Sequence, residues 1–172
     1  MRLEVWKDIP GYEGRYQAST FGRIRSVDQT ITQIGRWGNP FTRHIKGRIL
    51  RPGRSKSGHL SVVLGHGAHG SQVHQLVLLT FLGPVPKGME VRHLNGIPSD
   101  NHIENLVYGT RTENILDVYA IGKPWRMLTA DDALKVRSAI DHGDSGASIA
   151  KRFGMSQSNV SAIRNGVTYW WL

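Results

Sequence analysis

The most apolar stretch of the chain covers residues 74–82, and Gly83 and Pro84 follow it directly. Six of its nine residues are aliphatic or aromatic, so apolar side chains would point in almost every direction around a helix. A helix of that kind is buried on all sides, and Gly followed by Pro is a common helix end. The pattern therefore predicts a buried helix over residues 74–82.

Two short apolar segments follow, separated by a polar loop. Residues 89–93 and 106–109 have the length and composition of strands, and residues 94–105 between them are rich in Asn, Asp and Pro. Thr110 then stands three residues before Glu113, which is the spacing of a capping box at a helix start. The predicted order is strand, loop, strand and helix, with His93 at the end of the first strand.

The two ends of the chain have different patterns. Residues 15–19 and 23–27 are short β-like runs between Gly and aromatic residues, which predicts small hairpins. Towards the C-terminus, Thr129 and Ser156 are predicted helix caps, and Gly154 predicts a turn between two helices. The expected fold class is α+β, as an extended modular protein: a β-rich module (1–58), a central domain (59–121), and a linker with a helix-turn-helix domain (122–172).

The distribution of charge along the chain indicates the kind of partner that the protein binds. Lys and Arg number 22 against 13 Asp and Glu, and the net charge is about +8 over residues 1–58, −2 over 59–119 and +3 over 120–172. Basic ends around a mildly acidic centre indicate a polyanion such as nucleic acid. There is no cysteine, no apolar run near the ~18 residues of a membrane span, and no apolar N-terminal stretch typical of a signal peptide. A soluble, intracellular protein is expected.

The candidate catalytic and metal-binding residues lie in the central segment. A neutral imidazole such as that of His93 accepts a proton from an attacking water, and Asn oxygens are suitable ligands for Mg²⁺ or Mn²⁺. Together these groups suit metal-assisted phosphodiester hydrolysis. His74, at the start of the buried helix, is interpreted as a structural hydrogen-bonding group and not as a metal ligand.

The N-terminal residues resemble a known motif. Residues 6–19 and 22–26 carry Trp, Gly-Tyr-Glu-Gly, Tyr, Ser and Gly-Arg in the order found in the modular DNA-binding motif beside phage-type HNH nucleases. The resemblance implies that this segment binds DNA and that its aromatic residues form a small core.

The centre resembles the HNH, or ββα-metal, nuclease family, and specifically its homing-endonuclease branch. Residues 73–77, 81–84, 91–96, 100–101, 104–106 and 109–114 carry the resemblance, in the family's order and spacing. It implies a site-specific, divalent-metal-dependent DNA endonuclease encoded by a phage and acting in the cytoplasm of the bacterial host. By position, His93 matches the general base, Asn105 the residue that pins the loop around it, and Asn114 a ligand of one Mg²⁺ or Mn²⁺ ion.

One position departs from the family. The residue before the base is often Asp or His and binds the metal, whereas this chain has Arg92. A guanidinium cannot bind a cation. Three alternatives follow: Asn114 holds the metal with water and DNA phosphates, Asp100 or Asn101 supplies a further ligand, or the site is impaired. Arg92 would then serve as a clamp on the scissile phosphate.

Residues at both ends are candidates for DNA contact. In the N-terminal module they are cations interleaved with Gly and Ser, which let a main chain approach phosphates; in the C-terminal module they begin and end the predicted recognition helix. The candidates are Arg23, Arg25, Arg48, Arg54, Lys56, Gln157, Ser158, Asn159 and Arg164. Solvated protein surfaces are the alternative interpretation of both groups.

Three functions remain open at this point. The first is a nuclease that binds double-stranded DNA as a monomer, or as a dimer, and that nicks DNA if one chain acts alone. The second is a DNA-binding protein whose nuclease centre is impaired by Arg92. The third is an RNA-directed protein, which the helix-turn-helix pattern disfavours because the A-form major groove excludes a recognition helix.

Overall fold

The computed structural model describes residues 3–65, 68–121 and 128–170. The chain divides into two compact units, Met1–Thr110 and Arg111–Leu172, and each is described by itself. The predicted linker at residues 122–126 lies outside the described residues. Among the helices that the structure describes, none combines the length and hydropathy needed to span a membrane.

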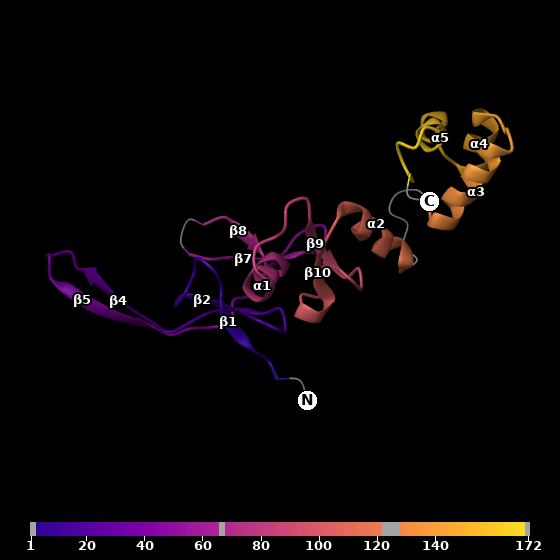
Figure 1. Ribbon diagram of the computed structural model, residues 1–172. Helices are drawn as coiled ribbons and strands as arrows, with labels where there is room; N and C mark the ends of the chain where they lie inside the picture. The colour runs from indigo at the N-terminus through magenta and orange to yellow at the C-terminus, as the bar shows by residue number, and fades with distance from the viewer. Residues whose placement is uncertain (1–2, 66–67, 122–127, 171–172) are drawn as a thin grey trace. The chain divides into compact units, whose positions relative to one another are not determined.

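The N-terminal unit consists of small antiparallel sheets around one helix (Figure 1). Its elements, in chain order, are β1 (Trp6–Asp8), β2 (Tyr16–Ser19), β3 (Ile24–Ser26), β4 (Gln29–Ile34), β5 (Pro40–Ile45), β6 (Gly53–Arg54), β7 (Leu60–Val63), β8 (Gly70–Gln72), α1 (Val73–Leu82), β9 (Glu90–His93), the 3-10 turn η1 (Ile103–Asn105) and β10 (Leu106–Gly109). The sheets pair as β1-β2-β3, β4-β5, β6-β7-β8 and β9-β10. The α+β class and the hairpins predicted near the N-terminus are confirmed.

Helix α1 is the centre of this unit. It is apolar on nearly every side, as predicted, and begins at Val73, one residue before the predicted start. It ends where the N–H of Gly83 bonds to the carbonyl of Leu79, and Gly83 has a φ of 94°, which glycine adopts without strain. The helix contacts strands of three sheets, so its burial holds them together.

One hydrophobic core joins two segments that were predicted to be separate domains. Ile9, Ala18 and Ile24 of the β1-β2-β3 sheet are at most 2% exposed and belong to the same cluster as Val77 and Leu106. Small sheets cannot bury an apolar face alone, so this sheet uses α1 as its second layer. The compact units of the structure meet after Thr110, whereas the domain bounds at residues 58 and 121 stay a prediction.

The β4-β5 hairpin differs from the rest of the unit because it has almost no core. Every residue of β5 is exposed, and Figure 1 shows the hairpin extending away from the other strands of the N-terminal unit. At its tip, Trp37 is 85% exposed beside Arg36. Such a ribbon gains little stability from burial, and its exposed surface suits contact with a partner.

The C-terminal unit is helical. It contains α2 (Arg111–Ala120), α3 (Ala130–Asp141), α4 (Gly146–Phe153) and α5 (Gln157–Arg164). The side chains of Thr129, Ser145 and Ser156 each accept a hydrogen bond from a backbone N–H in the first turn of α3, α4 and α5. Gly154 ends α4 in the left-handed conformation. The predicted caps at Thr129 and Ser156 and the predicted turn are therefore confirmed, while the helix-turn-helix function remains a prediction.

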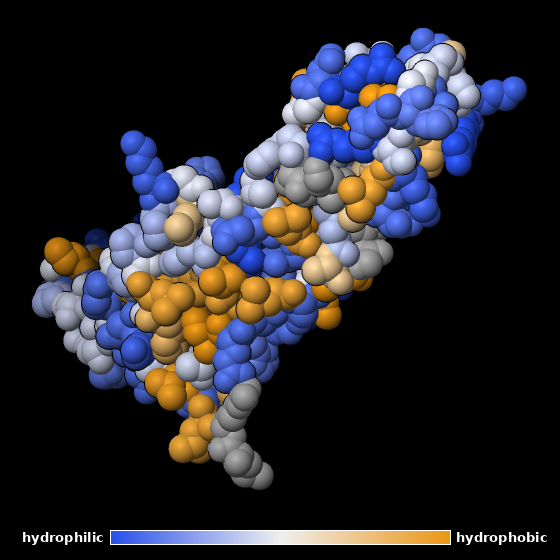
Figure 2. All heavy atoms as spheres, turned by 45° about the vertical axis from the view of Figure 1, so that its right-hand side comes forward, coloured by the Kyte–Doolittle hydropathy of each residue, from blue (hydrophilic) through white to orange (hydrophobic). Residues whose placement is uncertain are grey.

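Apolar surface is exposed on the N-terminal unit as well (Figure 2). Val85 and Met89 are 53% and 42% exposed, and they line a groove of about 410 Å³ with Leu79 and Tyr108. Among the residues that the structure describes, no histidine and no cation lines this groove. It is therefore not a candidate for phosphodiester chemistry. The candidate site lies instead around His93, at the end of β9.

Candidate active site

His93 is the last residue of β9, where it pairs with Leu106 of β10. It is 9% exposed, and its Nε2 lies 3.3 Å from Oδ1 of Asn101, a residue that is itself buried. Burial lowers the pKa of His93, although the hydrogen bond to Asn101 acts in the opposite direction. The ring is therefore neutral at pH 7 and offers one nitrogen lone pair to a proton or a cation.

The loop after His93 is held by side-chain hydrogen bonds. Asn105 accepts from the backbone N–H of Asn95 at 2.9 Å and donates to the carbonyl of Asp100 at 2.8 Å. Asn95 in turn donates to the Asp100 carboxylate at 2.6 Å. Because Asn105 bonds to both sides of the loop, its position suits the pinning role that the sequence resemblance implies.

The turn between β2 and β3 packs on this loop. A Cβ atom at Gly22 would lie 2.5 Å from the backbone carbon and oxygen of Asn101, closer than real Cβ atoms approach. The N–H of Ile103 donates to the carbonyl of Thr20, and Phe21 stacks on His102 at 5.2 Å between ring centroids. The N-terminal segment therefore supports the loop that contacts His93, a connection that sequence reasoning missed.

The rings of two more histidines lie beside that of His93. His59, just before β7, and His74, on α1, have ring centroids 5.6 Å and 5.1 Å from that of His93, and 5.0 Å from each other. One nitrogen of each ring lies within 4.8 Å of the others. We call these three residues the histidine triad. Sequence reasoning considered His93 and His74 separately and did not bring these three together.

His74 is the most constrained member of the triad. It is 4% exposed, and its Nδ1 is buried without a hydrogen-bond partner among the described residues. Burial, followed by the neighbouring His93 and His59, lowers its pKa to about 4. From the sequence, His74 was interpreted as a structural group that forms hydrogen bonds. That interpretation does not explain why its Nδ1 is buried without a partner among the described residues.

Acid should destabilise the N-terminal unit through His74. The ring is neutral in the fold and has an ordinary pKa near 6.5 when unfolded, so stability present above pH 6.5 is lost as pH falls toward 4. The loss is expected to be about 2 kcal/mol at pH 5.0, at ~1.4 kcal/mol for each pH unit below 6.5. Urea unfolding at pH 7.5 and 5.0 measures it: His74→Leu should reduce the pH dependence, whereas His69→Leu, at an exposed site, should not. Equal pH dependence in wild type and His74→Leu would exclude this role.

Arg92 and Asn114 lie in different units. Arg92 is a partly buried residue of β9, opposite Val107. Asn114 is on α2 of the C-terminal unit, and its role as a metal ligand stays a prediction. Of the two alternative ligands, Asn101 directs its Oδ1 to His93, and the Asp100 carboxylate accepts from Asn95.

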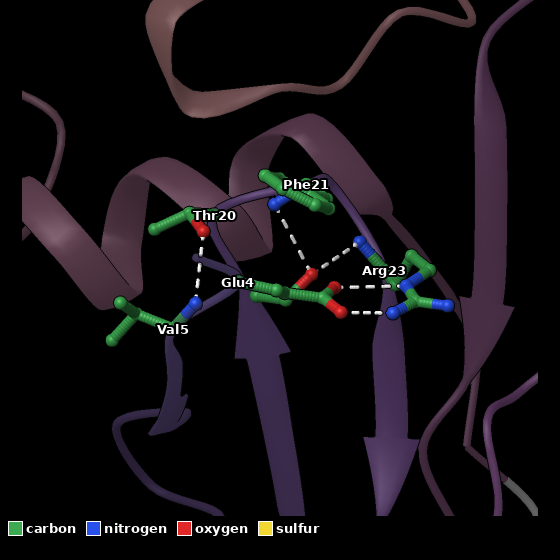
Figure 3. Close-up of polar contacts among 6 residues, drawn as sticks. Glu4, Val5, Thr20, Phe21 and Arg23 are labelled. Atoms are coloured by element: carbon green, nitrogen blue, oxygen red, sulfur yellow. Dashed lines mark hydrogen bonds and ion pairs between the residues drawn. The ribbon is translucent and has the colours of Figure 1, made fainter. Parts of the chain in front are cut away.

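Arg23 and Arg25, which were predicted to face DNA, have partners within the protein. Arg23 donates to both carboxylate oxygens of Glu4, as Figure 3 shows, and this ion pair lowers the pKa of Glu4. Arg25 donates to Oε1 of Gln17 at 2.9 Å and 2.6 Å, and its guanidinium lies 4.3 Å from the centroid of the Trp6 ring. Both arginines thus help to build the β1-β2-β3 sheet, and DNA contact by them stays a prediction.

The other predicted DNA contacts are exposed. Arg48, Arg54 and Lys56 lie on the surface of the N-terminal unit, and Arg48 lines a concave surface with Arg25. In the C-terminal unit the exposed residues are Gln157, Ser158 and Asn159 in the first turn of α5 and Arg164 in its last turn. Sequence reasoning did not select Arg36 and Arg43 of the β4-β5 hairpin, which are exposed too.

Known families match both parts of this site. Residues 4–65 match the NUMOD4 motif, and residues 71–116 match the HNH endonuclease family. The second match includes His74, His93, Asn105 and Asn114, whereas His59 falls within the first.

Individual proteins are similar as well. The chain is 31% identical to an uncharacterised HNH endonuclease of Acanthamoeba polyphaga mimivirus over 120 residues, which are 66% of this chain and 26% of the relative. It is also 31% identical to DNA endonuclease I-HmuI of Bacillus phage SP01 over 112 residues, which are 64% of this chain and 55% of that protein. The chain thus spans about a quarter of the length of the mimivirus relative and about half of the length of I-HmuI.

A solved structure shares the fold. The structure described as DNA binding and cleavage by the HNH homing endonuclease I-HmuI superposes with a TM-score of 0.52 and 24% sequence identity. The match covers 94% of this chain and 90% of that one.

Proposed function

Because the chain carries a NUMOD4 motif followed by an HNH endonuclease domain, we propose that it is a site-specific DNA endonuclease with His93 as its general base. The observation that carries this proposal is the state of His93. It is a buried, neutral histidine at a strand end, bonded to Asn101 on a loop that Asn105 ties together. A base must be neutral and fixed in direction to accept a proton efficiently.

The reaction assigned to this site is hydrolysis of a DNA phosphodiester. His93 accepts a proton from a water molecule as the water oxygen bonds to phosphorus. The bond from phosphorus to the 3′ oxygen breaks, and that oxygen leaves with a proton from solvent. The products are a 3′ hydroxyl and a 5′ phosphate, and the imidazolium returns its proton to water.

A divalent cation, when bound, would stabilise the charge on the pentacovalent phosphate and on the leaving 3′ oxygen. Among the described residues, the one group of three close His, Asp or Glu ligands is the histidine triad, which contains no carboxylate. Mg²⁺ prefers oxygen ligands and keeps several waters. Asn114 would hold the ion through its amide oxygen, and phosphate oxygens of DNA and water would fill the remaining positions.

We assign Arg92 to the scissile phosphate and not to the metal. An Arg–phosphate pair supplies charge-assisted hydrogen bonds of about 1.5–3 kcal/mol each. Arg92→Asp is therefore expected to slow cleavage about 10- to 100-fold, as measured by strand scission at saturating Mg²⁺. Arg92→Lys, which keeps the charge, should lose less. Faster cleavage and tighter metal binding in Arg92→Asp would show instead that Arg92 blocks a ligand position.

The two ends of the chain are proposed to bind duplex DNA while the centre cuts it. The first 58 residues carry a net charge of about +8 and the last 53 about +3. The β4-β5 hairpin has no acidic residue, and a two-stranded ribbon has the width that the major groove admits. In α5, Gln157, Ser158 and Asn159 are exposed, and we assign them to base contacts at the start of a recognition helix.

Salt dependence of binding tests the N-terminal contacts. Replacing Arg48, Arg54 and Lys56 together by Gln should weaken binding to target and random duplex alike. Each lost phosphate contact should also reduce the slope of log affinity against log salt by about 0.9. Lys87→Gln, at an exposed site in the acidic centre, is the control and should leave the slope unchanged. A triple variant with the wild-type slope would remove these residues from the interface.

The main alternative is a DNA-binding protein with an impaired nuclease centre, which Arg92 at a usual ligand position favours. A footprint and a cleavage map on the same end-labelled duplex distinguish the two. The proposal expects a protected site with a break inside or beside it in Mg²⁺ or Mn²⁺. One active centre per chain also predicts a nick in one strand when the protein acts as a monomer. Protection without a break in either metal would support the alternative.

A further inference from the structure

We propose that the histidine triad of His59, His74 and His93 is a site for a borderline transition-metal cation such as Zn²⁺, distinct from the Mg²⁺ position assigned to Asn114. The three rings come from three segments of the N-terminal unit, and one nitrogen of each lies within 4.8 Å of the others. Zinc bonds to histidine nitrogen at about 2.0–2.1 Å, so tetrahedral ligands lie roughly 3.3 Å apart. Small side-chain rotations would bring the triad to that spacing.

The surroundings of the rings are those of metal ligands. A histidine that binds metal usually bonds through its second ring nitrogen to a fixed oxygen. His59 has such a contact from Nδ1 to Oγ of Ser57 at 2.9 Å, and His93 has one from Nε2 to Asn101 at 3.3 Å. With these contacts in place, the other nitrogen of each ring would be the one that binds the ion.

His74 gives a second observation, independent of the distances between the rings, that points to a bound cation. Its ring is 4% exposed, and Nδ1 is buried with no hydrogen-bond partner in the part of the chain that the structure describes. An unsatisfied buried nitrogen is unfavourable, and a bound cation would satisfy it. The low pKa of His74 also means that binding there does not require removal of a proton at neutral pH.

The chemistry of the ligands selects the ion. Three imidazoles without a carboxylate favour Zn²⁺, Co²⁺, Ni²⁺ or Cu²⁺ over Mg²⁺, which prefers oxygen ligands. Three histidines also leave a fourth position for water, so the site would resemble an open zinc site.

Occupancy of the triad would have a consequence for catalysis, and this part rests on the proposed function. The neutral ring of His93 has one lone pair. A nitrogen that binds Zn²⁺ cannot accept a proton from water, so the general base is withdrawn while the ion is bound. Zinc should therefore inhibit cleavage without displacing DNA.

The experiment titrates the full chain with Zn²⁺ and, separately, with Co²⁺. Calorimetry is expected to show one Zn²⁺ per chain with a dissociation constant on the order of micromolar or tighter. Bound Co²⁺ should give the visible absorption of a four- or five-coordinate site with nitrogen ligands. His59→Phe, which keeps a ring in place, should weaken zinc at least about tenfold. His69→Phe, at an exposed site outside the triad, should bind as wild type does.

Several outcomes overturn the proposal. Absence of one-to-one zinc binding by the folded wild-type chain does so, as does Co²⁺ that stays six-coordinate. Equal zinc affinity in wild type and His59→Phe also excludes the triad. These readouts require no nuclease activity, so they stand if the proposed function fails. If the chain does cleave DNA, the ratio of rates with and without zinc should fall in wild type and stay near one in His59→Phe.

Discussion

Replacing His93 by alanine is expected to lower the single-turnover rate of DNA cleavage by about 10²–10⁴-fold, the range for loss of a general base. Binding of the target duplex should change little. His93 is 9% exposed and contacts Asn101 and the other two histidines of the triad, and it is not one of the proposed DNA contacts. Strand scission and affinity, measured on the same labelled duplex, separate the two effects.

The control for this variant is His69→Ala, which removes an exposed imidazole of the same unit. It should cleave and bind as wild type does. Unfolding of His93→Ala must be measured alongside, because the ring is buried. A folded His93→Ala protein with undiminished turnover would exclude His93 as the base.

Replacing Gly22 by alanine is the second change with a large expected effect. The new methyl group would lie 2.5 Å from the backbone of Asn101, which cannot move without moving the loop. Asn101 contacts His93, so the base would be displaced from its working direction. A misplacement of about 1 Å costs roughly 10²-fold in rate, and we expect a loss of that size in kcat.

Gly14→Ala is the matched control. Gly14 and Gly22 both have positive φ, 67° and 75°, so alanine strains the backbone similarly at the two positions. A Cβ atom at Gly14 meets nothing within 4 Å, however. Both variants should lose some stability, but only Gly22→Ala should lose cleavage. Equal losses of activity would mean that backbone strain, and not the contact with Asn101, explains the effect.

The elements that sequence predicted well are those fixed by local signals. Helix α1 follows from a mostly apolar run with Gly83 at its end. Helices α3 and α5 begin where Thr129 and Ser156 cap them. Caps, periodicity and Gly conformations act within a few residues, so one sequence is sufficient to find them.

Non-local packing was not predictable in the same way. Nothing near Ile9 or Ile24 shows that these side chains share a core with α1, so residues 1–58 were expected to form a separate module. The same holds for Gly22 and Asn101, which meet only in the fold although 79 positions separate them. A glycine at a turn does not show, from the sequence alone, which atoms a side chain at that position would contact.

The site was predicted in part. His93 at a strand end and Asn105 in the following loop could be selected from the pattern and the family resemblance, and the loop hydrogen bonds agree with their expected positions. His59 and His74 gave no comparable signal, because metal-ligand spacing along a sequence is visible only when ligands share one helix or loop. Their proximity to His93 arises from three separate segments.

The central claim is that this chain hydrolyses DNA, and the most direct test is a supercoiled plasmid carrying the footprinted site. With Mg²⁺ or Mn²⁺, the wild-type protein should convert it to a nicked circle that DNA ligase reseals, because the break leaves a 3′ hydroxyl and a 5′ phosphate. A chelator should prevent the break. Plasmid that stays supercoiled in both metals while the protein is bound would contradict the account.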